Sequence, residues 1–178
     1  MKKTILFVLS ILACSATAQE APVTTPNLFS VTILLPGLEY ETALSEKTTL
    51  DFRVAMGFGY ASGTYRETEF GIFPSFHAQY RYFYNFAKRI EKEKHIANNS
   101  GNYIALHTGL YSGNPIIGDL AYNADYMAEA GPVWGIQRVY NSGFKLDLHL
   151  GAGLGFNDLD ETYLSPLIGF RLGWLLSN

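Results

Sequence analysis

Ionisable side chains recur at alternate positions in several segments whose other residues are mainly apolar. Acids and bases are equally numerous at these positions, which hold Glu39, Glu41, Asp51 and Asp147 as acids and Arg53, Arg81, Lys145 and Arg171 as bases. Residues at alternate positions of a strand share one face, and charges enclosed by protein must be paired. The balance predicts a self-neutralising ionic network, with a proton or ion path as the functional alternative.

Three histidines, His77, His107 and His149, occupy the same alternating positions. None lies two or four residues from another, the spacing of typical ligand pairs, and the single cysteine of the chain, Cys14, is far away in the sequence. We therefore predict no metal site and no cofactor.

A catalytic serine needs a histidine base within hydrogen-bond reach and a third group that orients this base. Ser75 lies two residues before His77, but both are expected to face inward, away from any lipid substrate. His107 is followed by Thr108, which falls on the opposite face. We predict no catalytic residue. The predicted polar network is structural and comprises Glu39, Glu41, Asp51, Arg53, His77, Gln79, Arg81, Gln137, Lys145, Asp147, His149 and Arg171.

The elements that position these residues are β-strands, because alternation with a period of two dominates the chain. In residues 144–156, for example, Leu146 and Leu148 alternate with Lys145 and Asp147. Pro36-Gly37 divides one long apolar segment, because proline does not belong inside a central strand. Eight strands are predicted, at 27–35, 38–45, 48–60, 72–86, 101–111, 126–140, 143–156 and 163–176.

The apolar positions form long, unbroken rows, whereas the polar positions carry glycines and isolated charges. Glycines suit a cramped interior, and an outward apolar band with aromatic ends is typical of a membrane barrel. A soluble, lipocalin-like barrel would place lysine and glutamate outside. The predicted fold is therefore an all-β, antiparallel, up-and-down, eight-stranded transmembrane β-barrel. Its expected aromatic girdle consists of Tyr84, Phe86, Tyr140 and Trp174.

Composition agrees with this fold. The chain has 178 residues, of which 48% are hydrophobic and only 16% charged, and its net charge of −3 excludes a broad basic surface for nucleic acid. One cysteine excludes a disulfide scaffold. The length predicts a single domain.

The N-terminus has the pattern of a signal peptide. Lys2 and Lys3 precede an apolar run, and Ala16-Thr17-Ala18 forms a small-residue cleavage site. We predict a signal peptide at 1–18, an N-terminal periplasmic segment at 19–26 and the barrel at 27–178. In the alternative, Cys14 is lipidated and becomes the first mature residue.

Two connections stand out by their composition. Residues 88–94 are rich in lysine and glutamate, and we predict a solvated periplasmic loop there in preference to a short helical turn. Residues 157–162 form an acidic outer loop. Carboxylates could bind calcium, but the spacing is not that of an EF-hand loop, so a solvated loop is expected.

The chain resembles the small eight-stranded outer-membrane β-barrels of Gram-negative bacteria, the OmpX/OmpW-like group. The resemblance is carried by the signal peptide, by Gly37-Leu38-Glu39-Tyr40-Glu41, by Tyr80-Arg81-Tyr82 and by the glycine-alternating segments 151–155 and 169–174. It implies location in the outer membrane. The expected partners are outer-membrane lipids, lipopolysaccharide and the barrel-assembly machinery, and the expected state is a monomer. The chain departs from the group at its end, Trp174-Leu175-Leu176-Ser177-Asn178, because such barrels usually end on an aromatic residue.

The expected function is non-enzymatic, with a structural, adhesive or stress-protective role. Two alternatives stay open on the same fold. One is a lipid A-modifying acyl hydrolase or transferase, and the other is a narrow transporter of small apolar molecules.

Overall fold

Alternating apolar and polar residues form strands along most of the chain in the computed structural model, which describes residues 25–63 and 66–177. The strands are β1 (Leu28–Thr32), β2 (Gly37–Ser45), β3 (Thr48–Gly63), β4 (Arg66–Tyr82), β5 (Asn102–Ser112), β6 (Ile117–Gly118), β7 (Tyr126–Val139), β8 (Phe144–Asn157) and β9 (Thr162–Ser177), and a short helix, α2, spans Phe86–Glu91. The predicted signal peptide, Cys14 and most of 19–26 lie outside the described residues. No helix in the described part of the chain is long and apolar enough to cross a membrane.

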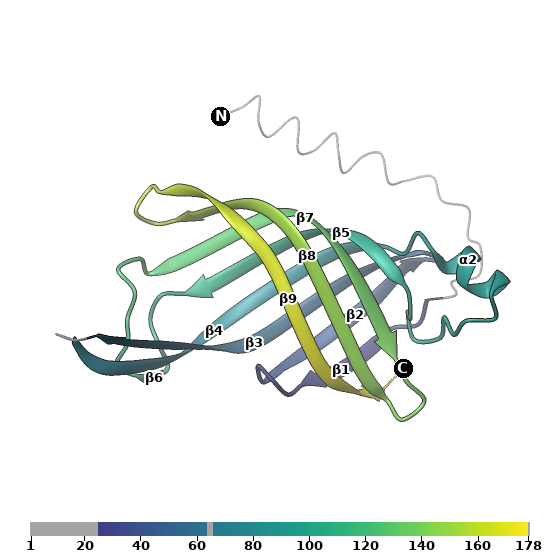
Figure 1. Cartoon of the computed structure of the whole chain (residues 1–178), viewed down its shortest axis with the longest axis horizontal. Coiled ribbons are helices and arrows are strands. Elements are labelled where there is room, and N and C mark those ends of the chain that lie inside the picture. The colour runs from purple at the N-terminus through teal and green to yellow at the C-terminus, as the bar shows by residue number, and fades with distance from the viewer. Residues whose placement is uncertain (1–24, 64–65, 178) are drawn as a thin grey trace.

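Eight of the strands form a ring (Figure 1). Each of β1, β2, β3, β4, β5, β7, β8 and β9 pairs antiparallel with the next, and β9 pairs with β1 to close the sheet. The prediction of an antiparallel, up-and-down, eight-stranded barrel is therefore confirmed.

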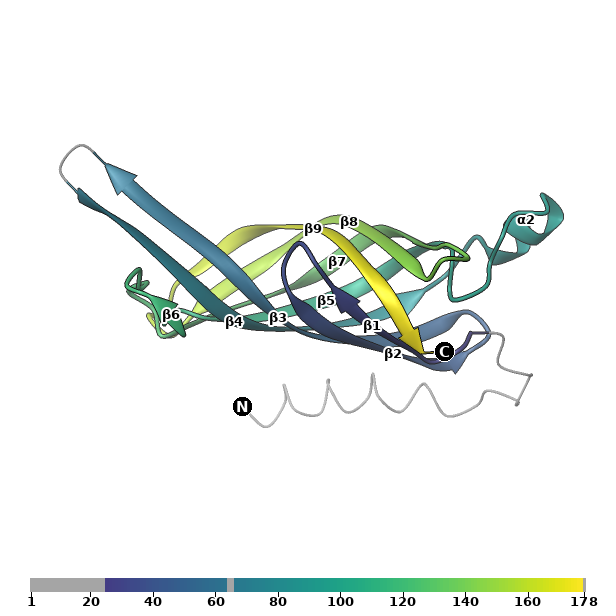
Figure 2. The same ribbon diagram turned by 90° about the horizontal axis from the view of Figure 1, so that it is seen from below.

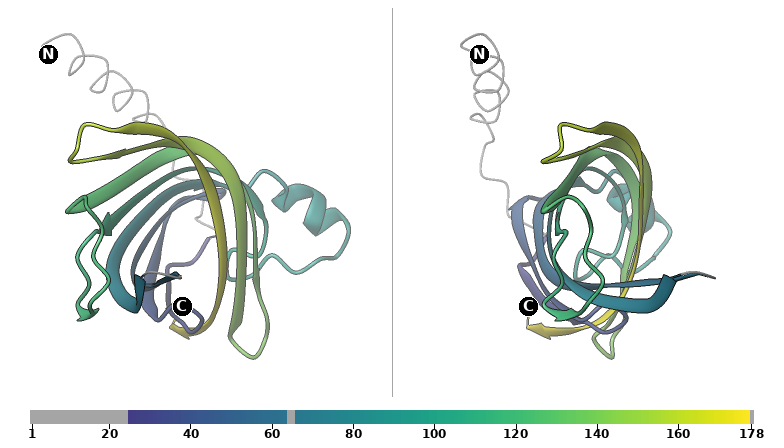
Figure 3. Two further views of the ribbon diagram at one scale, coloured as in Figure 1. Left: turned by 60° about the vertical axis from the view of Figure 1, so that its left-hand side comes forward. Right: turned by 90° about the vertical axis from the view of Figure 1, so that its left-hand side faces the viewer.

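The ring is complete at only one end, because β1 and β2 are short. The last pairs that these strands make are Thr32↔Gly173 with β9 and Gly37↔Ala55 with β3. Beyond these pairs, β3 and β9 continue without a partner from β1 or β2. We call the eight-stranded part the closed half and the remaining six-stranded part the open half; Figure 3 views the barrel from the side of the open half.

The connections differ between the two ends. Short turns and α2 lie at the end of the closed half. Strand β1 begins and strand β9 ends at this same end. At the other end, the β3–β4 hairpin projects beyond the rest of the barrel (Figure 2). The two-residue strand β6, which the sequence pattern did not predict, pairs with β4 through Gly71↔Gly118 at the base of this hairpin.

Three boundary predictions were wrong. The first predicted strand, 27–35, ends at Thr32, because a turn at 33–36 starts earlier than Pro36-Gly37 indicated. The fourth, 72–86, begins earlier, at Arg66, and ends at Tyr82. Residues 86–91 form α2, so the first part of 88–94, for which a solvated loop was predicted, is helical.

An aromatic cluster explains why the chain leaves β4 early. Phe86, predicted as part of the exposed girdle, is instead buried at the start of α2. Its ring stacks on Phe83 with the centroids 4.8 Å apart, and Phe83 contacts Tyr103 edge-on. Burial of these three rings removes a large apolar area from solvent. The cluster packs inside the barrel at the end where α2 lies.

Candidate functional site

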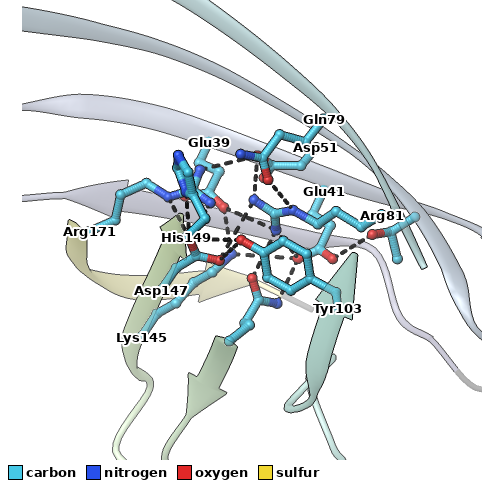
Figure 4. Close-up of polar contacts among 12 residues, drawn as sticks. Glu39, Glu41, Asp51, Gln79, Arg81, Tyr103, Lys145, Asp147, His149 and Arg171 are labelled. Carbon is cyan, nitrogen blue, oxygen red and sulfur yellow. Dashed lines mark hydrogen bonds and ion pairs between the residues drawn. The ribbon is translucent and has the colours of Figure 1, made fainter. Parts of the chain in front are cut away.

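The polar network of the interior is the candidate site. All twelve side chains predicted for it are buried, with exposed fractions of 8% or less: Glu39, Glu41, Asp51, Arg53, His77, Gln79, Arg81, Gln137, Lys145, Asp147, His149 and Arg171. They come from β2, β3, β4, β7, β8 and β9. Figure 4 shows nine of them close together: Glu39, Glu41, Asp51, Gln79, Arg81, Lys145, Asp147, His149 and Arg171. Strand pairing places opposite charges face to face at Glu39↔Arg53 and Asp147↔Arg171.

Arg81 lies at the centre of this network. Its guanidinium donates to Asp51 Oδ1 at 2.7 Å, to Gln79 Oε1 at 2.8 Å and to Gln137 Oε1 at 2.9 Å. It also lies over the ring of Tyr103, 4.9 Å from the centroid. Because the side chain is fully buried, these partners replace all the water that it would bind in solution.

Arg171 connects two acids on opposite walls. Its Nε and Nη2 donate to Asp147 Oδ1 at 3.0 and 2.5 Å, and its Nη1 donates to Asp51 Oδ1 at 3.2 Å. The hydroxyl of Tyr103 donates to both oxygens of Asp147, at 3.0 and 3.1 Å. Asp147 is thereby held by a cation and a neutral donor at once.

Lys145 contacts the remaining two acids, Glu39 and Glu41. Its Nζ donates to Glu39 Oε1 at 2.7 Å and lies 3.5 Å from Glu41 Oε2. Glu41 also accepts from the Thr49 hydroxyl at 2.7 Å and from Gln137 Nε2 at 2.8 Å. The network thus links β2, β3, β4, β5, β7, β8 and β9 through hydrogen bonds. Many of these bonds are charge-assisted, and such bonds are stronger than neutral ones.

A second polar cluster lies toward the open half and is organised by Glu129, which the sequence analysis missed. This carboxylate accepts from Ser165 Oγ at 2.7 Å and from the Tyr111 hydroxyl, and it lies 3.6 Å from His107 Nε2. Glu129 and Tyr103 both occupy odd-numbered, inward positions of their strands. Extending the alternation of β7 and β5 by a few residues would have identified both.

The three inward histidines lie side by side between the two clusters. Their ring centroids are 5.7 Å apart for His77 and His107, and 5.3 Å apart for His107 and His149. His107 Nδ1 hydrogen-bonds to Gln79 at 3.0 Å. Among the described residues, Nδ1 of both His77 and His149 has no hydrogen-bond partner.

Two groupings within the interior have the residue types of a metal site and of part of a catalytic triad. Oxygens of Glu39, Glu41 and Asp51 lie within 4.8 Å of one another, but Lys145 and the two central arginines already neutralise them. Ser75 Oγ lies 3.1 Å from His77 Nε2 but donates to the carbonyl oxygen of Ala55. In the described part of the chain, the unpartnered Nδ1 of His77 leaves this base without an orienting acid.

The other girdle residues face outward. Tyr84, Tyr140 and Trp174 are each about half exposed. Trp134, at an outward position of β7, donates from Nε1 to the hydroxyl of Tyr84 at 2.7 Å. The girdle of aromatic side chains near the α2 end therefore includes Trp134 in place of Phe86.

Comparison of the chain with protein-family models, with curated protein sequences and with solved structures found no match.

Proposed function

We propose that this protein is an outer-membrane β-barrel of the small eight-stranded kind, with a filled interior and a non-enzymatic role. The observation that carries the proposal is the inside-out distribution of polarity. Charged side chains are buried within the ring, while large apolar side chains such as Leu150, Leu164 and Ile168 are more than half exposed on its outer face. An exterior of this kind is stable in hydrocarbon and a liability in water.

The barrel topology also suits such a membrane. Because every backbone group in hydrocarbon needs a hydrogen-bond partner, strands span bilayers only in closed barrels, and the closed half of this barrel meets that requirement. In the proposed orientation, the α2 end faces the periplasm and the β3–β4 hairpin faces the cell exterior. Short periplasmic turns and longer outer loops are the usual arrangement.

The packed interior favours a structural, adhesive or stress-protective role over conduction. An eight-stranded barrel is just wide enough for side chains to fill it. Here Arg81 and its partners close the interior from wall to wall, and the Phe83–Phe86–Tyr103 cluster lies below them. Projecting outer loops on a rigid scaffold are the usual place for contacts with partners.

The test is electrophoresis of the washed outer-membrane fraction with and without boiling in SDS. A closed membrane barrel is expected to stay with the membrane and to migrate as a compact species until it is boiled. Protein that washes off, or that shows no shift on boiling, would contradict the proposal and favour the soluble barrel.

Two further measurements address the alternatives. In planar bilayers, the purified barrel is expected to give no ion current above background; a steady current would support the transport alternative. Lipid A masses from cells with and without the gene are expected to be identical, whereas loss of an acyl chain would support the enzyme.

A further inference from the structure

Arg138 is the one charged residue at the outward positions of the described strands β5, β7, β8 and β9. It lies on β7 between the outward side chains of Ile136 and Tyr140, near the α2 end. An arginine among lipid-facing residues near the edge of the bilayer can extend toward the headgroups. The other charged residues of these four strands face inward and are hydrogen-bonded there.

A second arginine lies beside it. Arg89 of α2 and Arg138 both line a cavity of about 470 Å³, together with His95 and Tyr140. Two guanidinium groups from separate elements therefore face one cavity at the edge of the outer wall.

Neutral oxygens are the partners of both guanidinium groups. Arg89 donates to the carbonyl oxygen of His95 at 2.6 Å. Arg138 donates to the carbonyl oxygens of Gly101 and Gln137 at 2.7 and 2.6 Å, and to Asn102 Oδ1 at 2.6 Å. Among the described residues, neither arginine has a carboxylate within 4 Å. These contacts fix the two side chains while leaving their charge uncompensated.

A separate apolar groove lies farther along the outer wall. Trp134 lies two outward positions beyond Arg138 on β7, about 13 Å along the strand. With Tyr82, Ile104 and Leu106 it lines a groove of about 560 Å³ over β4, β5 and β7. A cationic cavity at the bilayer edge, followed by an apolar groove toward the bilayer centre, matches a phospholipid in both charge and polarity.

We infer that this surface binds an anionic phospholipid of the periplasm-facing leaflet, with the phosphate between Arg89 and Arg138 and an acyl chain in the Trp134 groove. Arginine is well suited to bidentate phosphate contacts, and basic pockets at the headgroup level select anionic lipids. A zwitterionic lipid brings an ammonium group that the two arginines repel. The inference rests on the proposed membrane location.

Trp134 offers a direct reporter, because bromine atoms on an acyl chain quench a tryptophan that they touch. The chain has two tryptophans, so Trp174→Phe leaves Trp134 alone, and Trp134→Phe leaves Trp174 as the control for bulk lipid. Each variant is reconstituted into phosphatidylcholine vesicles that contain a minor fraction of phosphatidylglycerol brominated on its acyl chains. The expected preference for phosphatidylglycerol at Trp134 is about tenfold over its bulk fraction, with none at Trp174.

The matched charge control uses two lysines of the β4–β5 connection, which also carries Arg89. Arg89→Gln with Arg138→Gln, in the Trp134 reporter background, is expected to abolish the preference. Lys92→Gln with Lys94→Gln removes the same charge from exposed positions and is expected to leave the preference intact. Equal loss in both pairs would show diffuse attraction and overturn the site, as would equal quenching by brominated phosphatidylcholine.

Two more outcomes distinguish a failure of the lipid site from a failure of the proposed membrane barrel. Saturable binding of inorganic phosphate in detergent, without a preference for brominated phosphatidylglycerol, would assign a free-phosphate site and overturn the lipid site. Each sample is also run unboiled in SDS. A compact species without lipid preference contradicts only this inference, whereas absence of the compact species contradicts the proposed membrane barrel.

Discussion

The closed and open halves of the barrel share six strands but fill their interiors differently. In the closed half, the inward positions carry arginine, lysine, aspartate and glutamate. Arg81 and Arg171 each contact acids from more than one strand, and Lys145 contacts two acids of β2. In the open half, inward positions are often glycine, as at Gly57, Gly59, Gly153 and Gly155. Glu129 is the acid that organises the smaller polar cluster there.

The difference shows where a barrel can hold charge. A buried ion costs several kcal/mol unless good geometry and further hydrogen bonds compensate for the lost water. A complete ring supplies partners from all directions, as the contacts of Arg81 illustrate. The open half lacks β1 and β2 and therefore has fewer strands that could supply partners to a buried charge. Small side chains and the smaller polar cluster around Glu129 occupy its interior. This comparison makes the following predictions.

The largest effect is expected from removing the central cation. Arg81→Met would take from Asp51 the closer of its two guanidinium partners and from Glu41 the guanidinium that lies 3.6 Å away. Breaking a buried pair on one side costs about 3–5 kcal/mol. The measurement is the free energy of unfolding in urea, from vesicle-embedded protein.

The matched variant in the open half is Glu129→Gln, which keeps an oxygen acceptor for one of the two hydroxyls of Ser165 and Tyr111 and offers the other an amide N–H donor. Its expected cost is about 1 kcal/mol, as for a modest change in hydrogen bonding. Equal costs for Arg81→Met and Glu129→Gln would contradict the special role of the closed half.

The second effect tests the outer face rather than the interior. Leu148→Arg places a charge among outward apolar residues of β8, and we expect it to cost about 2–4 kcal/mol if that face contacts lipid. Ala55→Ser, at an inward position of β3, is expected to cost far less. Unfolding in urea measures both, and similar costs would refute the assignment of inside and outside.

A smaller effect is expected from inward glycines. At Gly135 of the closed half, a Cβ would overlap the ring of Tyr103, while at Gly57 of the open half the nearest atom, the carbonyl oxygen of Phe73, is 3.7 Å away. Gly135→Ala is expected to cost about 1–3 kcal/mol through overpacking, and Gly57→Ala much less. Thermal loss of the compact gel species gives the comparison, and a reversed order would show that the closed half is the looser one.

The alternation of residue types predicts most of this architecture, because a period of two assigns every residue of a strand to one face. That rule placed Arg81 and Asp147 inside before their contacts were known, and the twelve predicted interior residues are indeed buried. It could not predict that 86–91 would be helical, since Phe86 is held by tertiary stacking on Phe83. Nor does it show where pairing stops, because the short β1–β2 hairpin depends on a local turn whose apolar residues resemble strand.

The last prediction concerns the edge of β3 beyond the end of β2, and its test needs no substitution. Met56 donates its backbone N–H to the carbonyl oxygen of Pro36, so the N–H groups of even-numbered β3 residues point toward β2. Val54 and Phe52 meet Leu38 and Tyr40 there, whereas Phe58 and Tyr60 lie beyond the end of β2. Their amides are expected to exchange with solvent at least about a hundredfold faster than those of Val54 and Phe52, as hydrogen exchange measured by NMR in detergent micelles would show. The amide of Gly59, which points toward β4, is the control for local stability and is expected to stay protected. Slow exchange at Phe58 and Tyr60 would mean that another chain or segment covers this edge in the folded protein, and the open half would then be closed from outside.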